Sequence, residues 1–139
     1  LGGIAGADAI CNADPAKPAI TPNSYKALIA VGGTRTGSPL TGWVFAANTQ
    51  YFLADGTTQI LTTNASSVFT FGSLSTSFSG TNYWTGLTTT WGPNGSHCTN
   101  WTSAAGSGMT GDGSSTSNSS ISNVTQLCNT TRNLVCVQQ

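Results

Sequence analysis

Apolar residues recur at helical spacing near the start of the chain. Within residues 1–11, Ile4, Ala7, Ile10 and Cys11 recur at helical spacing, and Pro15 ends the pattern. The spacing predicts a short helix whose Cys11 faces inward.

A second helical pattern follows in TPNSYKALIAV, residues 21–31. Thr21 is a typical capping residue, Pro22 is favoured in the first turn of a helix, and Gly32 stops the pattern. Two short helices are therefore expected in the N-terminal part of the chain.

From Trp43 onward, the pattern changes to short runs of β-branched and aromatic residues broken by Gly, Asn and Ser. The candidate strands are WVFAA (43–47), YFL (51–53), QILTT (59–63), VFTF (68–71), YWTGL (83–87) and NLVCV (133–137). Asp55-Gly56, between the second and third of these runs, is a hairpin signal. Two short helices followed by strands predict the α+β class, with a mostly antiparallel twisted sheet and long loops.

Residues 102–126 contain almost no side chain that can build a core, since only Met109, Ile121 and Val124 are sizeable and apolar. A polar stretch of this length is expected to be a long loop, and its role stays open between a binding loop and a solvated tether. It includes GSGMTG, residues 106–111, which matches the dinucleotide-binding pattern. Because no apolar strand leads into this motif and no helix former follows it, we interpret the match as accidental.

The length of 139 residues fits one domain, 1–139, and only 6% of the residues are charged, against about 25% in an average protein. The four acidic and four basic residues are scattered, and the net charge is zero. Binding to nucleic acid or adsorption to an anionic membrane needs clustered Lys and Arg, so neither partner is expected. No apolar run is long enough for membrane insertion, and no export signal stands at Leu1, so the chain is expected to be a mature or excised domain.

The four cysteines, Cys11, Cys98, Cys128 and Cys136, include no C-x-x-C pair, which disfavours zinc ribbons and thioredoxin-type sites. An even number without metal-ligand spacing predicts two disulfides and an oxidising compartment outside the cytoplasm. The spacing leaves all three connectivities open. Four buried free thiols in a cytosolic protein are the weaker alternative.

Residues 83–101 gather three of the four tryptophans, Cys98 and the only histidine, His97. Catalysis is not expected, because the chain has no Glu for a carboxylate pair and no G-x-S-x-G motif. Serine is so frequent that a Ser-His-Asp arrangement of His97 with Asp112 carries little information. One histidine and dispersed Asp residues also provide no zinc or calcium site, so neither a metal nor a cofactor is expected. His97 is expected to make a structural hydrogen bond.

Four segments occur in the order GADAICN (6–12), WTGL (84–87), CTNWTS (98–103) and LVCVQQ (134–139). They resemble a bacterial extracytoplasmic domain family that was long described only as a domain of unknown function and is typified by leptospiral endostatin-like surface proteins. The resemblance covers nearly the whole chain. That family is similar in turn to the C-type lectin-like (endostatin-like) fold, in which WTGL matches the central strand and Cys11 lies in a first helix.

The resemblance implies nested disulfides, Cys11 with Cys136 and Cys98 with Cys128, and a further strand before Leu1. It also implies an adhesin that binds host or surface macromolecules, protein or glycan, as part of a larger secreted or cell-surface protein. The sugar-binding triplets of calcium-dependent lectins and the histidines of the endostatin zinc site are absent. The fold is therefore expected to transfer, whereas calcium-dependent sugar binding is not.

Trp84 and Leu87 are expected in the core, because an aromatic residue on a central strand is usually packed. For Trp91 and Trp101, two interpretations stay open: a structural plug beside a disulfide, or a ligand surface on the loop-rich face. The ligand-binding candidates are Trp91, Asn94, His97, Asn100, Trp101 and Asp112. The alternatives to a protein-binding adhesin are a calcium-independent carbohydrate-binding lectin and a structural cap or spacer of a surface fibre or envelope protein.

Overall fold

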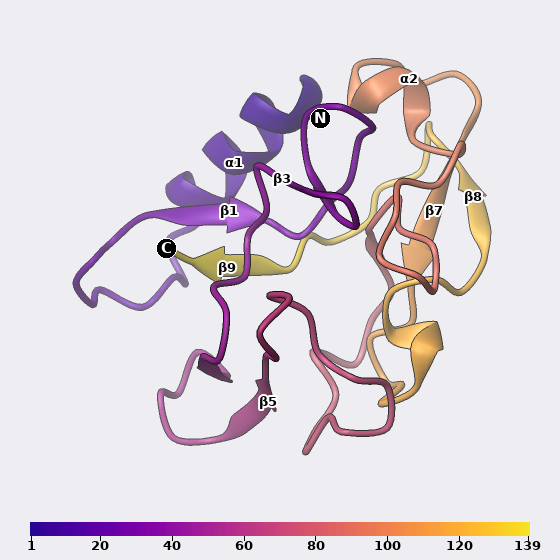
Figure 1. Cartoon of the computed structure of the whole chain (residues 1–139). Coiled ribbons are helices and arrows are strands. Elements are labelled where there is room, and N and C mark those ends of the chain that lie inside the picture. The colour runs from indigo at the N-terminus through magenta and orange to yellow at the C-terminus, as the bar shows by residue number, and fades with distance from the viewer.

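Nine short strands, two α-helices and one 3-10 helix form the structure of residues 1–139, which is a computed structural model (Figure 1). In chain order, the elements are α1 (Gly3–Ala13), β1 (Tyr25–Ala27), β2 (Thr36–Gly37), β3 (Leu40–Thr41), β4 (Gln50–Phe52), β5 (Gln59–Thr62), β6 (Tyr83–Trp84), α2 (Cys98–Trp101), β7 (Ser107–Gly111), the 3-10 helix (Asn118–Ser120), β8 (Thr125–Leu127) and β9 (Cys136–Gln138). All the pairings between these strands are antiparallel. The predicted α+β class with mostly antiparallel strands is confirmed.

The strands form four small sheets, in place of the single twisted sheet expected from the sequence. Three of the sheets are strand pairs, β1–β9, β2–β3 and β4–β5, and the fourth has the order β6–β7–β8. The longest strand, β7, has five residues, so each ladder is short. The pairing of β1 with β9 places the C-terminal end of the chain beside α1 and β1 (Figure 1).

Helix α1 confirms the first helical prediction, and Cys11 is fully buried as expected, whereas Ile10 is exposed. A disulfide between Cys11 and Cys136 joins this helix to β9. The second disulfide joins Cys98 to Cys128, and no cysteine is free. Both bonds are the ones implied by the family resemblance.

The helix predicted over residues 21–31 is wrong, because this segment contains β1 and no helical turn. Residues 28–31 are all buried. Successive residues of a helix point in different directions, so an amphipathic helix would bury only some of these four side chains. The backbone N–H of Leu28 donates to the carbonyl oxygen of Val135 at 2.8 Å. A run that is buried on every side pairs with distant segments more readily than it forms an amphipathic helix.

The hairpin predicted at Asp55-Gly56 is confirmed by the pairing of β4 with β5, and β6 and β9 overlap two further predicted strands. The strands predicted over 43–47 and 68–71 are wrong. Trp43 and Phe69 are buried, but the backbone around them joins no ladder. The indole N–H of Trp43 donates to the carbonyl oxygen of Ser67 at 2.8 Å. These apolar runs therefore fill the core from irregular backbone.

The long polar loop predicted over residues 102–126 is corrected by β7, which forms the centre of the three-stranded sheet. A side chain on Gly108 would meet the Trp84 ring and the Cys98 sulfur at 2.8 Å. Because glycine has no side chain, this strand lies directly against the core at Gly108, and its polar composition does not indicate a loop. Residues 107–111 of the G-x-G-x-x-G match form β7 itself and no α-helix follows them, which agrees with our interpretation of the match as accidental.

The core divides into two clusters. The larger cluster is rich in aromatic rings and contains Leu87, Trp91 and Ile121. The second cluster joins the buried face of α1 to Trp84 and Trp101. Trp84 and Leu87 are buried, as predicted.

Candidate ligand-binding groove

The two tryptophans that the sequence offered as ligand contacts are buried. Trp91 is 7% exposed and Trp101 is 1% exposed. The Trp91 ring stacks on Phe71 with 5.4 Å between centroids, and Trp101 donates its indole N–H to the carbonyl oxygen of Ala30 at 3.0 Å. Because neither ring has a free face, the ligand-surface interpretation is wrong for both. Trp101 packs in the same cluster as Cys98, as the structural interpretation requires, whereas Trp91 belongs to the other cluster.

The polar candidates near α2 are held in local turns. The Nδ1 atom of His97 accepts the backbone N–H of Asn100 at 3.0 Å and caps α2, which is the structural hydrogen bond expected of it. The Oδ1 atom of Asn94 accepts the backbone N–H of Ser96 at 2.8 Å. None of these residues lines either of the hollows described below.

Asp112 lies away from these residues, beyond the far end of β7. His97 bridges to Gly108 near the start of β7, whereas Asp112 follows its last residue. About 13 Å of strand therefore separates Gly108 from Asp112. Hydrogen bonds from Ser114 hold the pKa of the Asp112 carboxyl below its ordinary value. The loop-face candidates do not form one site, and no group of three His, Cys or Asp side chains gathers to hold a metal ion.

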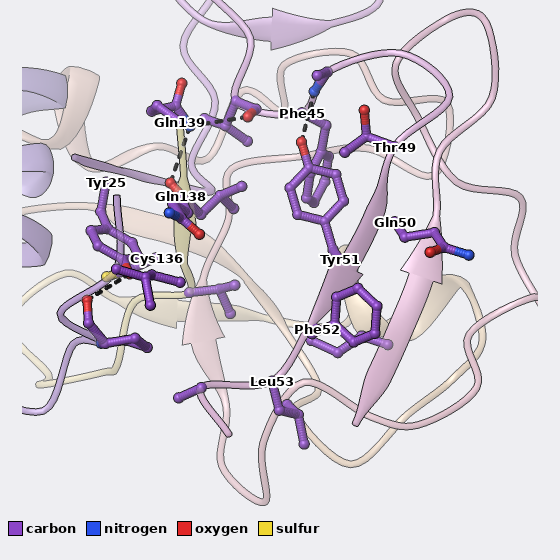
Figure 2. Close-up of a pocket in the computed structure, with 18 of the residues that line it drawn as sticks. Tyr25, Phe45, Thr49, Gln50, Tyr51, Phe52, Leu53, Cys136, Gln138 and Gln139 are labelled. Atoms are coloured by element: carbon purple, nitrogen blue, oxygen red, sulfur yellow. Dashed lines mark hydrogen bonds between the residues drawn. The ribbon is translucent and has the colours of Figure 1, made fainter. Parts of the chain in front are cut away.

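A groove of about 810 Å³ lies between β9 and the β4–β5 hairpin (Figure 2). One wall includes Cys136, Val137 and Gln138 from β9, and the other includes Tyr51 and Phe52 from β4. Of the 23 lining residues, 15 are hydrophobic, and none carries a charged side chain. Such a lining suits an apolar, uncharged ligand surface.

A second hollow of about 710 Å³ adjoins the groove. The two share seven lining residues, which include Phe52, Leu53 and Val135. Together they follow the last segment of the chain, because each residue of 131–139 lines one or both of them. We call the two hollows together the β9 trough.

Exposed hydrophobic side chains gather around the β9 trough. Ile20, 49% exposed, and Phe52, 43% exposed, line the groove. Leu1 and Ile10, which are also exposed, line the second hollow. A contiguous apolar surface at a hollow is typical of a binding site, whereas single exposed hydrophobic residues are common on any surface.

The walls of the groove are held by hydrogen bonds and ring contacts. The hydroxyl of Tyr51 accepts the backbone N–H of Ala46 at 2.8 Å, and its ring meets the edge of Phe45 at 4.9 Å between centroids. Burial raises the pKa of Tyr51. Gln138 donates to the carbonyl oxygen of Pro22 at 2.6 Å, which ties β9 to the loop beside it. The groove is therefore preformed.

No pattern in the sequence indicates this groove. Its walls come mainly from residues 18–25, 43–60 and 135–139, which are far apart in the chain. Their apolar side chains follow the same pattern as core residues, so no motif separated Phe52 from a buried phenylalanine. The sparse charge of the chain was the only signal that agreed with an uncharged site.

Comparisons with known proteins give one match. The model of a family described as a protein of unknown function (DUF1554) matches residues 1–119. No curated protein and no solved structure matches the chain. In the structure itself, neither helix has the length and apolar character that crossing a membrane requires.

Proposed function

Because the chain belongs to the DUF1554 family, whose function is unknown, we propose its function from the groove: it is a non-enzymatic, extracellular recognition domain that binds a partner protein. The observation that carries the proposal is a preformed, uncharged groove bordered by exposed hydrophobic side chains. Burying such a surface against a partner contributes about 25 cal/mol per Å² of apolar area, less the entropy of association. In this proposal, the partner binds in the groove and not on the loop-rich face.

We assign the domain to the C-type lectin-like, endostatin-like fold. Support comes from the disulfide between the first helix and the last strand, with the second disulfide nested inside it. The segment WTGL fits only in part: Leu87 is fully buried, but Trp84 lies on β6, at the end of the order β6–β7–β8, and pairs with Thr110 on the central strand β7. Fold alone does not identify the ligand, so the function is argued from the groove.

The chemistry of the groove favours binding over catalysis. No Asp, His, Lys or Arg side chain lines it, and the only histidine is engaged in capping α2. General acid–base catalysis needs a group that can transfer a proton near the working pH. The two disulfides support an oxidising, extracellular location.

The test is capture of purified extracellular proteins on an array by the disulfide-intact domain, with a glycan array in parallel. We expect one or more proteins to be captured, and capture to fall at least tenfold in the double variant Ile20→Ser, Phe52→Ser. Both side chains are exposed, so the fold should survive their truncation. The matched control is Leu40→Ser, Leu127→Ser, which removes two even more exposed hydrophobic side chains outside the groove and should leave capture unchanged.

Three outcomes contradict the proposal. Equal loss in both double variants would indicate nonspecific hydrophobic adsorption. Capture of glycans alone, in calcium-free buffer, would favour the lectin. Capture of neither class would favour a structural cap or spacer in a larger surface protein.

A further inference from the structure

Five Asp and Asn side chains fold back onto the main chain that follows them. In each, Oδ1 accepts the backbone N–H of the residue two places ahead at 2.8 to 3.0 Å, and the five are Asp14, Asp55, Asn64, Asn94 and Asp112. The ring that this hydrogen bond closes contains both the side-chain carbonyl carbon, Cγ, and the backbone nitrogen of the next residue. Those two atoms are the reactants of succinimide formation, so each turn is a candidate site for that reaction.

Succinimide formation at an asparagine needs no cofactor and no oxidant. The nitrogen of the next residue attacks Cγ, a new C–N bond forms, and the bond from Cγ to Nδ2 breaks. Ammonia leaves and carries away the proton of the attacking N–H. Water then opens the five-membered ring at either of its two carbonyl carbons, which gives aspartate or isoaspartate. One water is consumed and one ammonia is released.

The turn at Asn94 meets the requirements of this reaction. Asn94 is the only asparagine that is followed by glycine, and a Cβ on Gly95 would meet nothing within 4 Å, so the attacking nitrogen is unhindered. Neither the N–H of Gly95 nor the Nδ2 of Asn94 forms a hydrogen bond within the protein. The N–H of Ser96 donates to Oδ1 at 2.8 Å, and a donor at this position stabilises the negative charge that develops on the oxygen during attack.

Each of the other four turns lacks one requirement. Asn64 is followed by Ala65, whose Cβ crowds the nitrogen, and Asp14 is followed by a proline, which has no N–H. Asp55 and Asp112 precede glycines, but hydrogen bonds from nearby Thr and Ser residues hold the pKa of both carboxyls below the ordinary value. An ionised carboxylate is a poor electrophile and has no good leaving group. A carboxamide and an unhindered nitrogen therefore occur together only at Asn94.

We infer that Asn94-Gly95 is a modification site, at which the protein spontaneously forms a succinimide that water converts to aspartate and isoaspartate. The reaction adds one negative charge to a chain whose formal net charge is zero. Asn94 lines neither hollow of the β9 trough, so this inference is independent of the proposed function.

The main chain is held on both sides of the site. The N–H of Asn94 donates to the carbonyl oxygen of Gly86 at 2.7 Å, and the carbonyl oxygen of Ser96 accepts the N–H of Met109 at 2.8 Å. Isoaspartate inserts one carbon atom into the main chain between these two hydrogen bonds. Modification therefore changes the segment just before α2, and in the isoaspartate form hydrogen exchange of the Met109 N–H should quicken at least tenfold.

The experiment ages the disulfide-intact protein in mildly alkaline buffer and follows each asparagine by peptide mass spectrometry that distinguishes aspartate from isoaspartate. Conversion at Asn94 should be at least tenfold faster than at Asn64, which makes the same turn in the same sample. Gly95→Ala should slow conversion at Asn94 at least tenfold, and circular dichroism checks that the fold is intact. The reciprocal change, Ala65→Gly, should speed conversion at Asn64 at least fivefold.

Two results of the ageing experiment would overturn the inference. Equal rates at Asn94 and Asn64 would show that the glycine gives no advantage, and aspartate without isoaspartate would exclude a succinimide. A further comparison uses the reduced chain unfolded in urea. Conversion at Asn94 in the folded protein should be at least as fast as in the unfolded chain, because the Ser96 hydrogen bond is present only in the fold. A folded rate tenfold slower would show that the two flanking hydrogen bonds prevent the reactive geometry, and would also overturn the inference.

Discussion

Asp8 connects three parts of the molecule through one carboxylate. Its Oδ1 accepts the N–H of Ala27 and a guanidinium N–H of Arg35, and its Oδ2 accepts a second guanidinium N–H at 2.6 Å. Burial alone would raise the pKa of Asp8, but the hydrogen bonds from Arg35 and Ala27 hold it below its ordinary value. No pattern in the sequence indicates this pair, because the two residues are far apart among scattered charges.

Substituting Asp8→Ala is expected to destabilise the fold by about 3 kcal/mol, because Arg35 is only 4% exposed and would be left without a counter-charge. Urea unfolding of the disulfide-intact protein measures the loss. The control, Asp14→Ala, removes an exposed carboxylate that follows the same helix and should cost less than about 1 kcal/mol. Equal losses in the two variants would show that the Asp8–Arg35 pair contributes nothing specific.

Asp55, in the turn between β4 and β5, has a lowered pKa that a titration can test. Hydrogen bonds from the side chain and N–H of Thr58 and from the N–H of Thr57 lower the pKa of Asp55 from 3.8 to about 2. Because the folded pKa lies below the unfolded one, the contribution of Asp55 to stability is complete above about pH 4 and is lost as the pH falls through about 2. An NMR titration of its carboxyl carbon should give a midpoint near 2. In Thr58→Val the midpoint should rise toward the ordinary value, and a native midpoint already near 3.8 would contradict the geometry.

At the scale of elements, the local sequence pattern correctly predicted those helices and turns that local interactions determine. Helix α1 and the Asp55-Gly56 hairpin follow from spacing and turn chemistry that act within a few residues. Residues 21–31 carry good helix signals, yet residues 25–27 pair with β9 and residues 27–31 are buried. Tertiary burial overrides a helical pattern when every side of the segment is covered, and sequence spacing does not reveal that cover.

The candidate site was harder to predict than the fold. Trp91 and Trp101 drew attention because tryptophan serves both cores and binding surfaces, and only exposure distinguishes the two uses. The β9 trough has no motif, because segments that are far apart in the chain form its walls. Hydrogen-bond pairing of β9 is set by β1, at the opposite end of the chain.

Strand β7 carries a prediction about close packing. A Cβ on Gly111 would lie 2.2 Å from the carbonyl oxygen of Ser120, which also accepts a hydrogen bond from the buried hydroxyl of Tyr83. Gly111→Ala should therefore destabilise the protein by about 2 kcal/mol through overpacking. Gly95→Ala, where a Cβ meets nothing within 4 Å, is the matched control and should change stability by less than about 0.5 kcal/mol. Thermal unfolding of the two variants separates them, and equal melting temperatures would refute the packing argument.

Across the whole molecule, helices and strands account for only a minority of the backbone hydrogen bonds. Of 61 backbone–backbone hydrogen bonds, 20 lie within helices and strands, and the other 41 are in turns, loops and caps. The two core clusters are small, and one ion pair is present. Few regular elements connect the segments of such a fold, so it depends on its disulfides for stability.

The outer disulfide should therefore be the more important of the two. Cys11 and Cys136 are 125 residues apart in sequence, whereas Cys98 and Cys128 are separated by 30. In the chain-entropy model these closures stabilise the native state by about 5 and about 3.6 kcal/mol. The outer bond also holds β9 against α1, so its removal frees the last strand of the chain from the first helix.

Urea unfolding of Cys11→Ala, Cys136→Ala and of Cys98→Ala, Cys128→Ala tests this ranking. The first double variant should lose about 1 kcal/mol more stability than the second, in line with the longer loop. In native hydrogen exchange it should also lose protection at the Val137 amide, whereas the second variant should lose protection near β8, next to Cys128. A greater loss from the inner pair would mean that native packing around Cys98 and Trp101, rather than closure of the unfolded chain, determines how much each disulfide contributes.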